Sequence, residues 1–120
     1  MSQILVIDDS ALMRRILRQH LEQGGYEVQD WLPLSAMEIP DYLAAHPVDL
    51  ILTDYQMPGV NGLTVAKMAM RAAPTVPVVV LTSQRDPESE AQLLKFKVRR
   101  VVQKPITPEA LLALVKELLG

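Results

Sequence analysis

The chain has 120 residues, 49% hydrophobic and 22% charged, and these values predict one ordered domain over residues 1–120 and exclude a disordered segment. A formal net charge of −2 gives no global attraction to nucleic acid or anionic lipid, so we expect neither as a direct partner. The chain lacks cysteine, and its first residues do not have the pattern of a signal peptide. No apolar run approaches the roughly 18 residues that a membrane span requires. We therefore expect a cytoplasmic protein.

Short apolar runs alternate with helical patterns along the chain, which predicts βα units on a parallel sheet. The first run, Ile4 to Ile7, leads to the acidic pair Asp8 and Asp9. Ser10 is placed to cap the helix that follows, and Gly24-Gly25 would end it. Five apolar residues are expected on one face of this helix: Leu12, Met13, Ile16, Leu17 and Leu21.

The second unit, residues 26–46, has the least regular pattern. Val28 lies in a short expected strand. Ser35 and Glu38 have the spacing of a capping box, but Pro40 is expected to break a helix there within a turn or two. We therefore expect an irregular or shortened second helix.

The densest apolar run, Val48 to Leu52, is typical of a strand buried on both faces. It leads to Asp54 and to a turn at Met57–Gly59. The later elements follow in order: a helix over 63–70, a strand over 77–81, a helix from 87, a strand over 100–103 and a helix from 107.

Polar side chains stand where four of the predicted strands end. Asp8 and Asp9 follow the first strand, Asp54 the third, Thr82 the fourth and Lys104 the fifth. A doubly wound parallel sheet gathers these ends at one edge, so we expect the side chains to meet. Crowded carboxylates repel one another unless a cation is bound, and hard oxygen ligands suit Mg²⁺. An ammonium and a hydroxyl beside them would serve an anion, which predicts phosphoryl transfer to an aspartate.

These motifs resemble those of the receiver domain of two-component response regulators, in the manner of the single-domain chemotaxis regulators. The matching residues are Asp8-Asp9, Asp54, Met57-Pro58, Gly62, Thr82 and Lys104-Pro105. The resemblance covers essentially the whole chain. It implies a flavodoxin-like α/β fold, a doubly wound five-stranded parallel sheet in the order 2-1-3-4-5 with helices on both faces.

By this resemblance Asp54 would be the phosphoacceptor. It would take the phosphoryl group from the phosphohistidine of a sensor histidine kinase, from a phosphotransfer protein or from a small phosphodonor. Asp9, Asp54 and the backbone carbonyl of Gln56 would bind Mg²⁺ directly, and Asp8 would act mostly through water. The chain would be a signalling receiver and no enzyme beyond its own phosphorylation and dephosphorylation.

The resemblance also implies how a signal would leave the site. Thr82 and Lys104 would contact the phosphoryl group, and the peptide before Pro105 would be cis. Val101 stands three residues before the lysine, where the family usually carries Tyr or Phe, so the usual aromatic switch is absent. The output would pass to an unknown downstream protein or an attached effector domain, from a monomer or weak dimer.

The run Lys95 to Arg100 is basic, where the family has small residues and Gly. Two interpretations stay open. Cations at a helix end are favoured by the helix dipole and need no partner. Phe96 among these charges would also serve as an anchor for a docked protein.

Two other functions remain possible for this sequence. One is a protein-interaction module that keeps the receiver fold and works without phosphorylation. The other is a phosphohydrolase with an aspartyl nucleophile, which would need a second acid two residues later, where Gln56 stands. His20 and His46 have no ligand-like neighbours and are not expected to bind a metal.

Overall fold

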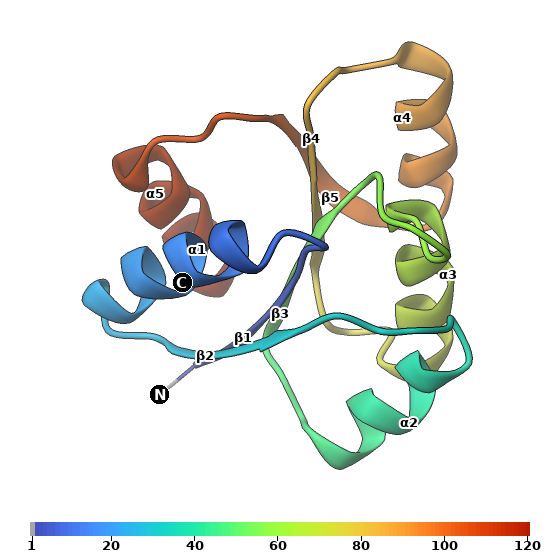
Figure 1. The fold of residues 1–120 in the computed structure, drawn as a ribbon, viewed down its shortest axis with the longest axis horizontal. Helices are drawn as coiled ribbons and strands as arrows, with labels where there is room; N and C mark the ends of the chain where they lie inside the picture. The colour runs from blue at the N-terminus through green and yellow to red at the C-terminus, as the bar shows by residue number, and fades with distance from the viewer. Residues whose placement is uncertain (1) are drawn as a thin grey trace.

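Five parallel strands form the centre of the fold, in the order β2-β1-β3-β4-β5 (Figure 1). The structure is a computed structural model and describes residues 2–120. The strands are β1 (Gln3–Ile7), β2 (Glu27–Trp31), β3 (Leu50–Asp54), β4 (Val78–Thr82) and β5 (Val98–Gln103). The helices are α1 (Ala11–Gln23), α2 (Glu38–Ala45), α3 (Gly62–Ala72), α4 (Pro87–Lys95) and α5 (Pro108–Leu119).

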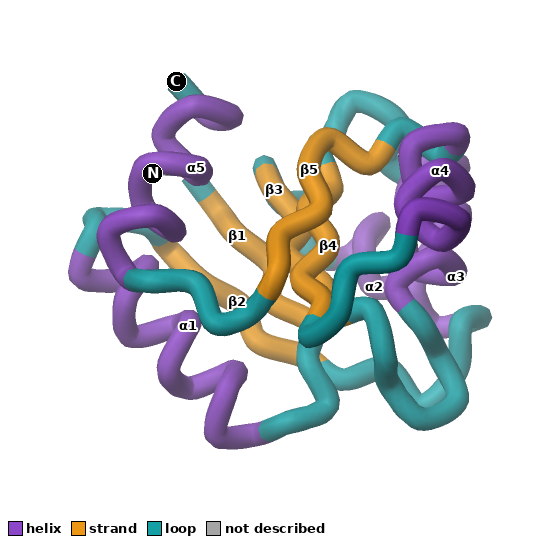
Figure 2. Tube along the Cα trace, turned by 90° about the horizontal axis from the view of Figure 1, so that it is seen from above, coloured by secondary structure: helices purple, strands orange, loops and turns teal. Residues whose placement is uncertain are grey.

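Helices cover both faces of the sheet. Figure 1 shows α1 and α5 on one face and α2, α3 and α4 on the other, and Figure 2 shows the same layers from above. The predicted doubly wound, flavodoxin-like fold is therefore confirmed, together with its strand order. Within residues 2–120, no helix combines the length and the apolarity needed to cross a membrane.

The central strands are buried on both faces because each face is covered by helices. Every residue of β3 and β4 is buried, which explains why these strands are continuous apolar runs. The edge strands β2 and β5 instead include exposed polar residues, as Glu27 and Arg100 illustrate. The apolar runs of the sequence thus identify the interior strands directly.

Side-chain caps start most of the helices. Ser10 accepts a hydrogen bond from the backbone N–H of Met13, as predicted, and Thr107 does the same for α5. Asn61 and Asp86 cap α3 and α4 in the same way. Each cap satisfies one of the backbone donors that a helix leaves unpaired at its start.

The prediction for the buried face of α1 was wrong for Leu12, whose exposed fraction is 65%. Leu17 and Leu21 are buried and Met13 is half-buried, as predicted. Leu12 lies five positions before Leu17, about 140° around the helix, so it points away from the sheet. It belongs to the first turn, next to the carboxyl edge of the sheet.

The prediction that Pro40 would break the second helix was also wrong. The helix α2 starts at Glu38 and continues to Ala45, so Pro40 lies in its first turn, where a backbone N–H has no intrahelical partner. The Glu38 carboxylate accepts the backbone N–H groups of Leu34 and Ser35, at 2.6 and 2.9 Å. At eight residues α2 is nevertheless short, as expected.

The strand β5 begins at Val98, two residues earlier than predicted, and contains a β-bulge. Val98 pairs with Val78, whereas Arg100 pairs with Val79, so Arg99 is an extra residue in the ladder. The strand is thus irregular at its start and regular toward Gln103.

Candidate functional site

Three carboxylates meet at the carboxyl edge of the sheet. Asp8 and Asp9 follow β1 and Asp54 ends β3, and these two strands are neighbours. Each carboxylate offers an oxygen that lies within 4.8 Å of the others. The side chains differ in exposure, since Asp8 is 1% and Asp54 8% exposed whereas Asp9 is exposed to solvent. The fold therefore brings the three acids together, as predicted.

Lys104 brings an ammonium group into this acidic cluster from the end of β5. Its Nζ lies 3.1 Å from Oδ2 of Asp8 and 3.1 Å from Oδ1 of Asp54. Its backbone N–H donates to the carbonyl of Thr82 at 2.7 Å, which ties the ends of β4 and β5 together. The peptide bond between Lys104 and Pro105 is cis.

Burial and charge act against each other in this cluster. Burial raises the pKa of Asp54, the hydrogen bond and charge of Lys104 lower it, and Asp8 and Asp9 raise it; the net shift is upward. For Lys104 burial lowers the pKa, but its bonds to the two acids prevail and the net shift is upward. Three carboxylates against one ammonium leave an excess of negative charge. Hard oxygen donors with such an excess fit a divalent cation such as Mg²⁺.

Asp8 is fixed by contacts that the sequence analysis missed. Its Oδ1 accepts the backbone N–H of Ser10 at 2.9 Å, while its backbone carbonyl accepts Nη1 of Arg14 at 2.5 Å. The sequence spacing of Arg14, within α1, gives no sign of a role at the site. The only feature of the sequence that points to a contact with Asp8 is that Arg14 is the fourth residue of a helix that starts after Ser10.

A close backbone approach shapes the loop after Asp54. The N–H of Gly62 donates to the carbonyl of Tyr55 at 2.7 Å, at the start of α3. A Cβ atom at Gly62 would lie 3.0 Å from the Asp54 carbonyl oxygen and 3.0 Å from the Tyr55 Cα. Only glycine lets the helix begin so near the strand end, and Gln56 lies exposed in the loop between them.

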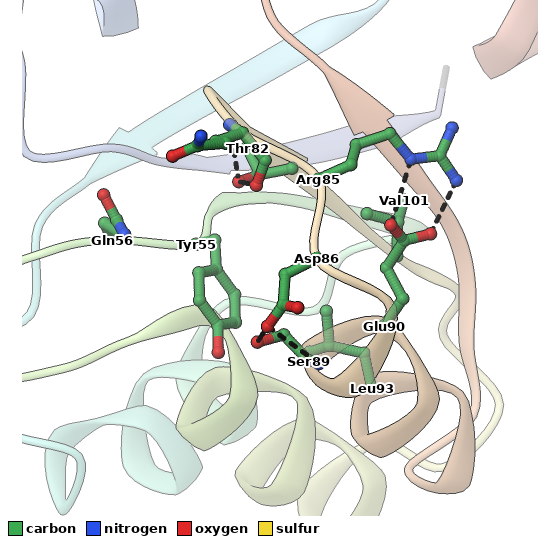
Figure 3. A pocket seen from close by; sticks show the side chains of 10 residues that line it. Tyr55, Gln56, Thr82, Arg85, Asp86, Ser89, Glu90, Leu93 and Val101 are labelled. Carbon is green, nitrogen blue, oxygen red and sulfur yellow. Dashed lines mark hydrogen bonds and ion pairs between the residues drawn. The ribbon is translucent and has the colours of Figure 1, made fainter.

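Thr82 faces its own loop in this structure. Its hydroxyl donates to the carbonyl of Gln84 at 3.0 Å and accepts the backbone N–H of Gln84 at 3.3 Å. Thr82 borders a hollow of about 360 Å³ between the β4–α4 loop and α4, shown in Figure 3. Val101 and Leu93 line the same hollow, and an ion pair of 2.6 Å between Arg85 and Glu90 also borders it. Val101 and Thr82 thus line the same open space.

A parallel α/β sheet with three carboxylates, a lysine and a threonine at its carboxyl edge defines the receiver class of signalling domains. The chain belongs to the family of the response regulator receiver domain, which it matches over residues 4–116. Receiver domains of this family interact with histidine kinases and output domains, and phosphorylation and Mg²⁺ are typical of them.

Curated relatives of two lengths match the chain. It is 30% identical to the chemotaxis protein CheY1 of Helicobacter pylori, over 98% of this chain and 96% of that protein. It is 32% identical to the phosphate regulon transcriptional regulatory protein PhoB of Pseudomonas aeruginosa, over 97% of this chain and 51% of that protein. The chain thus spans about half the length of the PhoB protein.

Solved structures share the whole fold. The chemotaxis protein CheY4 of Vibrio cholerae superposes with a TM-score of 0.87 at 26% identity, covering 99% of both chains. A CheY-like receiver domain protein of Methanospirillum hungatei gives a TM-score of 0.89 at 26% identity, covering 99% of this chain and 94% of that one. No element of the receiver fold is therefore missing from residues 2–120.

Proposed function

We propose that the chain is a phosphorylation-dependent switch whose phosphoacceptor is Asp54. The observation that carries this proposal is the position of Lys104, whose ammonium lies 3.1 Å from the Asp54 carboxylate within the acidic cluster. A positive charge held there would contact the oxygens of a phosphoryl group on Asp54. The donor would be the phosphohistidine of a sensor histidine kinase or phosphotransfer protein.

The transfer exchanges one bond to phosphorus for another. An oxygen of Asp54 attacks the phosphorus, the P–N bond of the phosphohistidine breaks, and the imidazole keeps the bonding pair. Asp9, Asp54 and the backbone carbonyl of Gln56 would hold Mg²⁺, with Asp8 acting through water. When bound, the ion would neutralise the charge of the phosphoryl oxygens.

The attacking group must be ionised. Burial raises the pKa of Asp54, whereas the ammonium of Lys104 stabilises the carboxylate form. Asp8 is held by Ser10 and Lys104, which keeps the second buried acid in place during the exchange. Lys104 therefore favours the charged form of the nucleophile against the effect of burial, and its contacts to both acids orient them.

The output would begin with Thr82. Its hydroxyl would leave the Gln84 carbonyl and turn to the phosphoryl group, and its loop would move at the hollow that Val101 lines. Because residue 101 has no ring to change rotamer, the loop and α4 themselves would carry the change to an output protein or attached domain.

Intact-protein mass spectrometry after incubation with acetyl phosphate and Mg²⁺ tests the phosphoacceptor. We expect wild type to gain the mass of one phosphoryl group and Asp54→Asn to gain none. Asp41→Asn, at an exposed acid of α2, is the matched control and should behave like wild type. An unmodified wild type, or a full gain in Asp54→Asn, would contradict the proposal.

The small residue at position 101 also favours a second candidate, a protein-interaction module that works without phosphorylation. Such a module would keep the fold but bind its partner equally well as wild type and as Asp54→Ala. Partner affinity measured for both forms, with and without acetyl phosphate, separates the two functions.

A further inference from the structure

A second hollow lies at the end of the sheet opposite the acidic cluster. It measures about 410 Å³ and is formed by the end of α3, the loop and start of β4, and the turn between α4 and β5. Its apolar lining includes Met70, Val76 and Phe96. Its charged lining consists of Lys97 and Arg99, and we call it the basic hollow. The acidic site lies at the other ends of the same strands.

The segments that line the basic hollow carry charges of one sign. No Asp or Glu occurs in residues 55–85 or 91–108, which supply all of its lining, although the chain as a whole has a net charge of −2. Lys67 of α3 adds another cation, with its Nζ 5.1 Å from the centre of the Phe96 ring. Among the described residues, no ion pair involves Lys67, Lys97 or Arg99. The hollow therefore presents cations that form no ion pair with a described acid.

Two backbone irregularities place these cations. Lys97 has a φ of 64°, the left-handed conformation that glycine usually supplies after a helix end. Arg99 is the extra residue of the β-bulge at the start of β5, and a bulge redirects a side chain. The conformation of Lys97 is one that side chains other than glycine rarely adopt, and both irregularities put a cationic side chain at the same hollow. Strain of this kind is concentrated at binding sites.

We propose that the basic hollow binds an acidic segment of a partner protein. One apolar side chain of the segment would sit against Met70, Val76 and Phe96, and carboxylates beside it would pair with Lys97 and Arg99. The two cations favour a negatively charged partner. The apolar lining favours a ligand with an apolar side chain over a phosphate group, which has none. A nucleic acid would need a longer cationic stripe and would meet the acidic remainder of the surface.

This binding site goes beyond the phosphorylation switch and does not depend on it. The basic hollow shares no residue with the acidic cluster or with the hollow beside Thr82. The test therefore uses unphosphorylated protein without Mg²⁺, and a failure at Asp54 would leave its outcome unchanged.

Fluorescence anisotropy with labelled synthetic peptides tests the proposal. The probe has one Phe between runs of Glu; its controls replace every Glu by Gln, or the Phe by Ala. We expect each control peptide to bind about tenfold more weakly than the probe. The double variant Lys97→Glu, Arg99→Glu should lose about the same factor. Lys116→Glu, at an exposed cation of α5, is the matched control and should bind like wild type.

Lys97→Gly separates binding from folding. Glycine relieves the left-handed conformation, so we expect Tm to rise by about 3 °C while the affinity for the probe falls several-fold. Lys97→Arg keeps the charge and should keep the affinity. A variant that merely misfolded would lose both Tm and affinity.

Three results would overturn the proposal. The Gln peptide could bind as tightly as the probe, which would remove the role of charge. A single-stranded oligonucleotide could bind more tightly than the probe, which would make the hollow a nucleic-acid site. Sedimentation could show self-association that Arg99→Glu abolishes, which would make a second copy of the chain the occupant.

Discussion

The position of Asp54 is fixed by contacts to its carboxylate and to the backbone that follows it. Lys104 pairs with its carboxylate at 3.1 Å, and the N–H of the next residue, Tyr55, donates to the Leu81 carbonyl at 2.9 Å. Gly62 lies against its backbone carbonyl, which fixes where the loop after β3 can return. The position of the acid thus depends on Tyr55 and Gly62 as well as on Lys104, although Tyr55 and Gly62 have no part in the proposed chemistry.

Gly62→Ala should therefore destabilise the protein by about 1–3 kcal/mol, because the new Cβ would press on backbone atoms that cannot move aside. Gly24→Ala is the matched control. Its Cβ would meet the end of the Leu112 side chain, which can rotate, so we expect a cost below about 1 kcal/mol. Urea denaturation of both variants measures the difference, and equal losses would contradict the argument.

The sequence was enough to predict which residues form the site, but not the orientation of each side chain. Asp8, Asp54 and Lys104 were predictable because parallel strands bring their carboxyl ends to one edge. The orientation of the Thr82 hydroxyl toward Gln84 depends on the conformation of one loop, which no periodic pattern encodes. Arg14 was missed for a similar reason, since its contact is to a backbone carbonyl, and any residue has one.

At the level of elements, the strands were easier to predict than the helix ends. Continuous apolar runs identified β3 and β4 because both faces are covered. The helix α2 was harder, since the effect of Pro40 depends on the residue at which the helix begins. The start of β5 was missed because a bulge does not alternate as a regular strand does.

The position of Pro40 in the first turn of α2 gives a direct test. Pro40→Ala should change the free energy of unfolding by less than about 1 kcal/mol, because the proline removes no intrahelical hydrogen bond. Ala44→Pro, at an exposed position in the last turn, should cost about 3 kcal/mol. Thermal unfolding followed by circular dichroism compares them, and a large loss in Pro40→Ala would refute this account of the helix.

Across the whole molecule, the acidic cluster and the basic hollow lie at opposite edges of the sheet. The acidic cluster lies where the strands end, and the basic hollow lies where β4 and β5 begin. By the two proposals above, a divalent cation would bind at one edge and an acidic segment of a partner at the other. Such separation is invisible in a net charge of −2.

A divalent cation should stabilise the fold as a whole, since it would bind the assembled acids and not the unfolded chain. At ten times its dissociation constant, Mg²⁺ should add about 1.4 kcal/mol to the free energy of unfolding. Asp9→Asn should abolish most of this gain, and Asp41→Asn should keep it. Scanning calorimetry with Mg²⁺ or with EDTA measures the effect, and an identical gain in all three proteins would exclude the acidic cluster as the binding site.

The ammonium that balances Asp8 and Asp54 comes from the end of the last strand. During translation, a nascent polypeptide exposes both acids long before residue 104 leaves the ribosome. The acids at the edge of its earlier strands have no such ammonium beside them until synthesis reaches that lysine. A fragment that ends before this point would keep both acids but lack the ammonium that pairs with them.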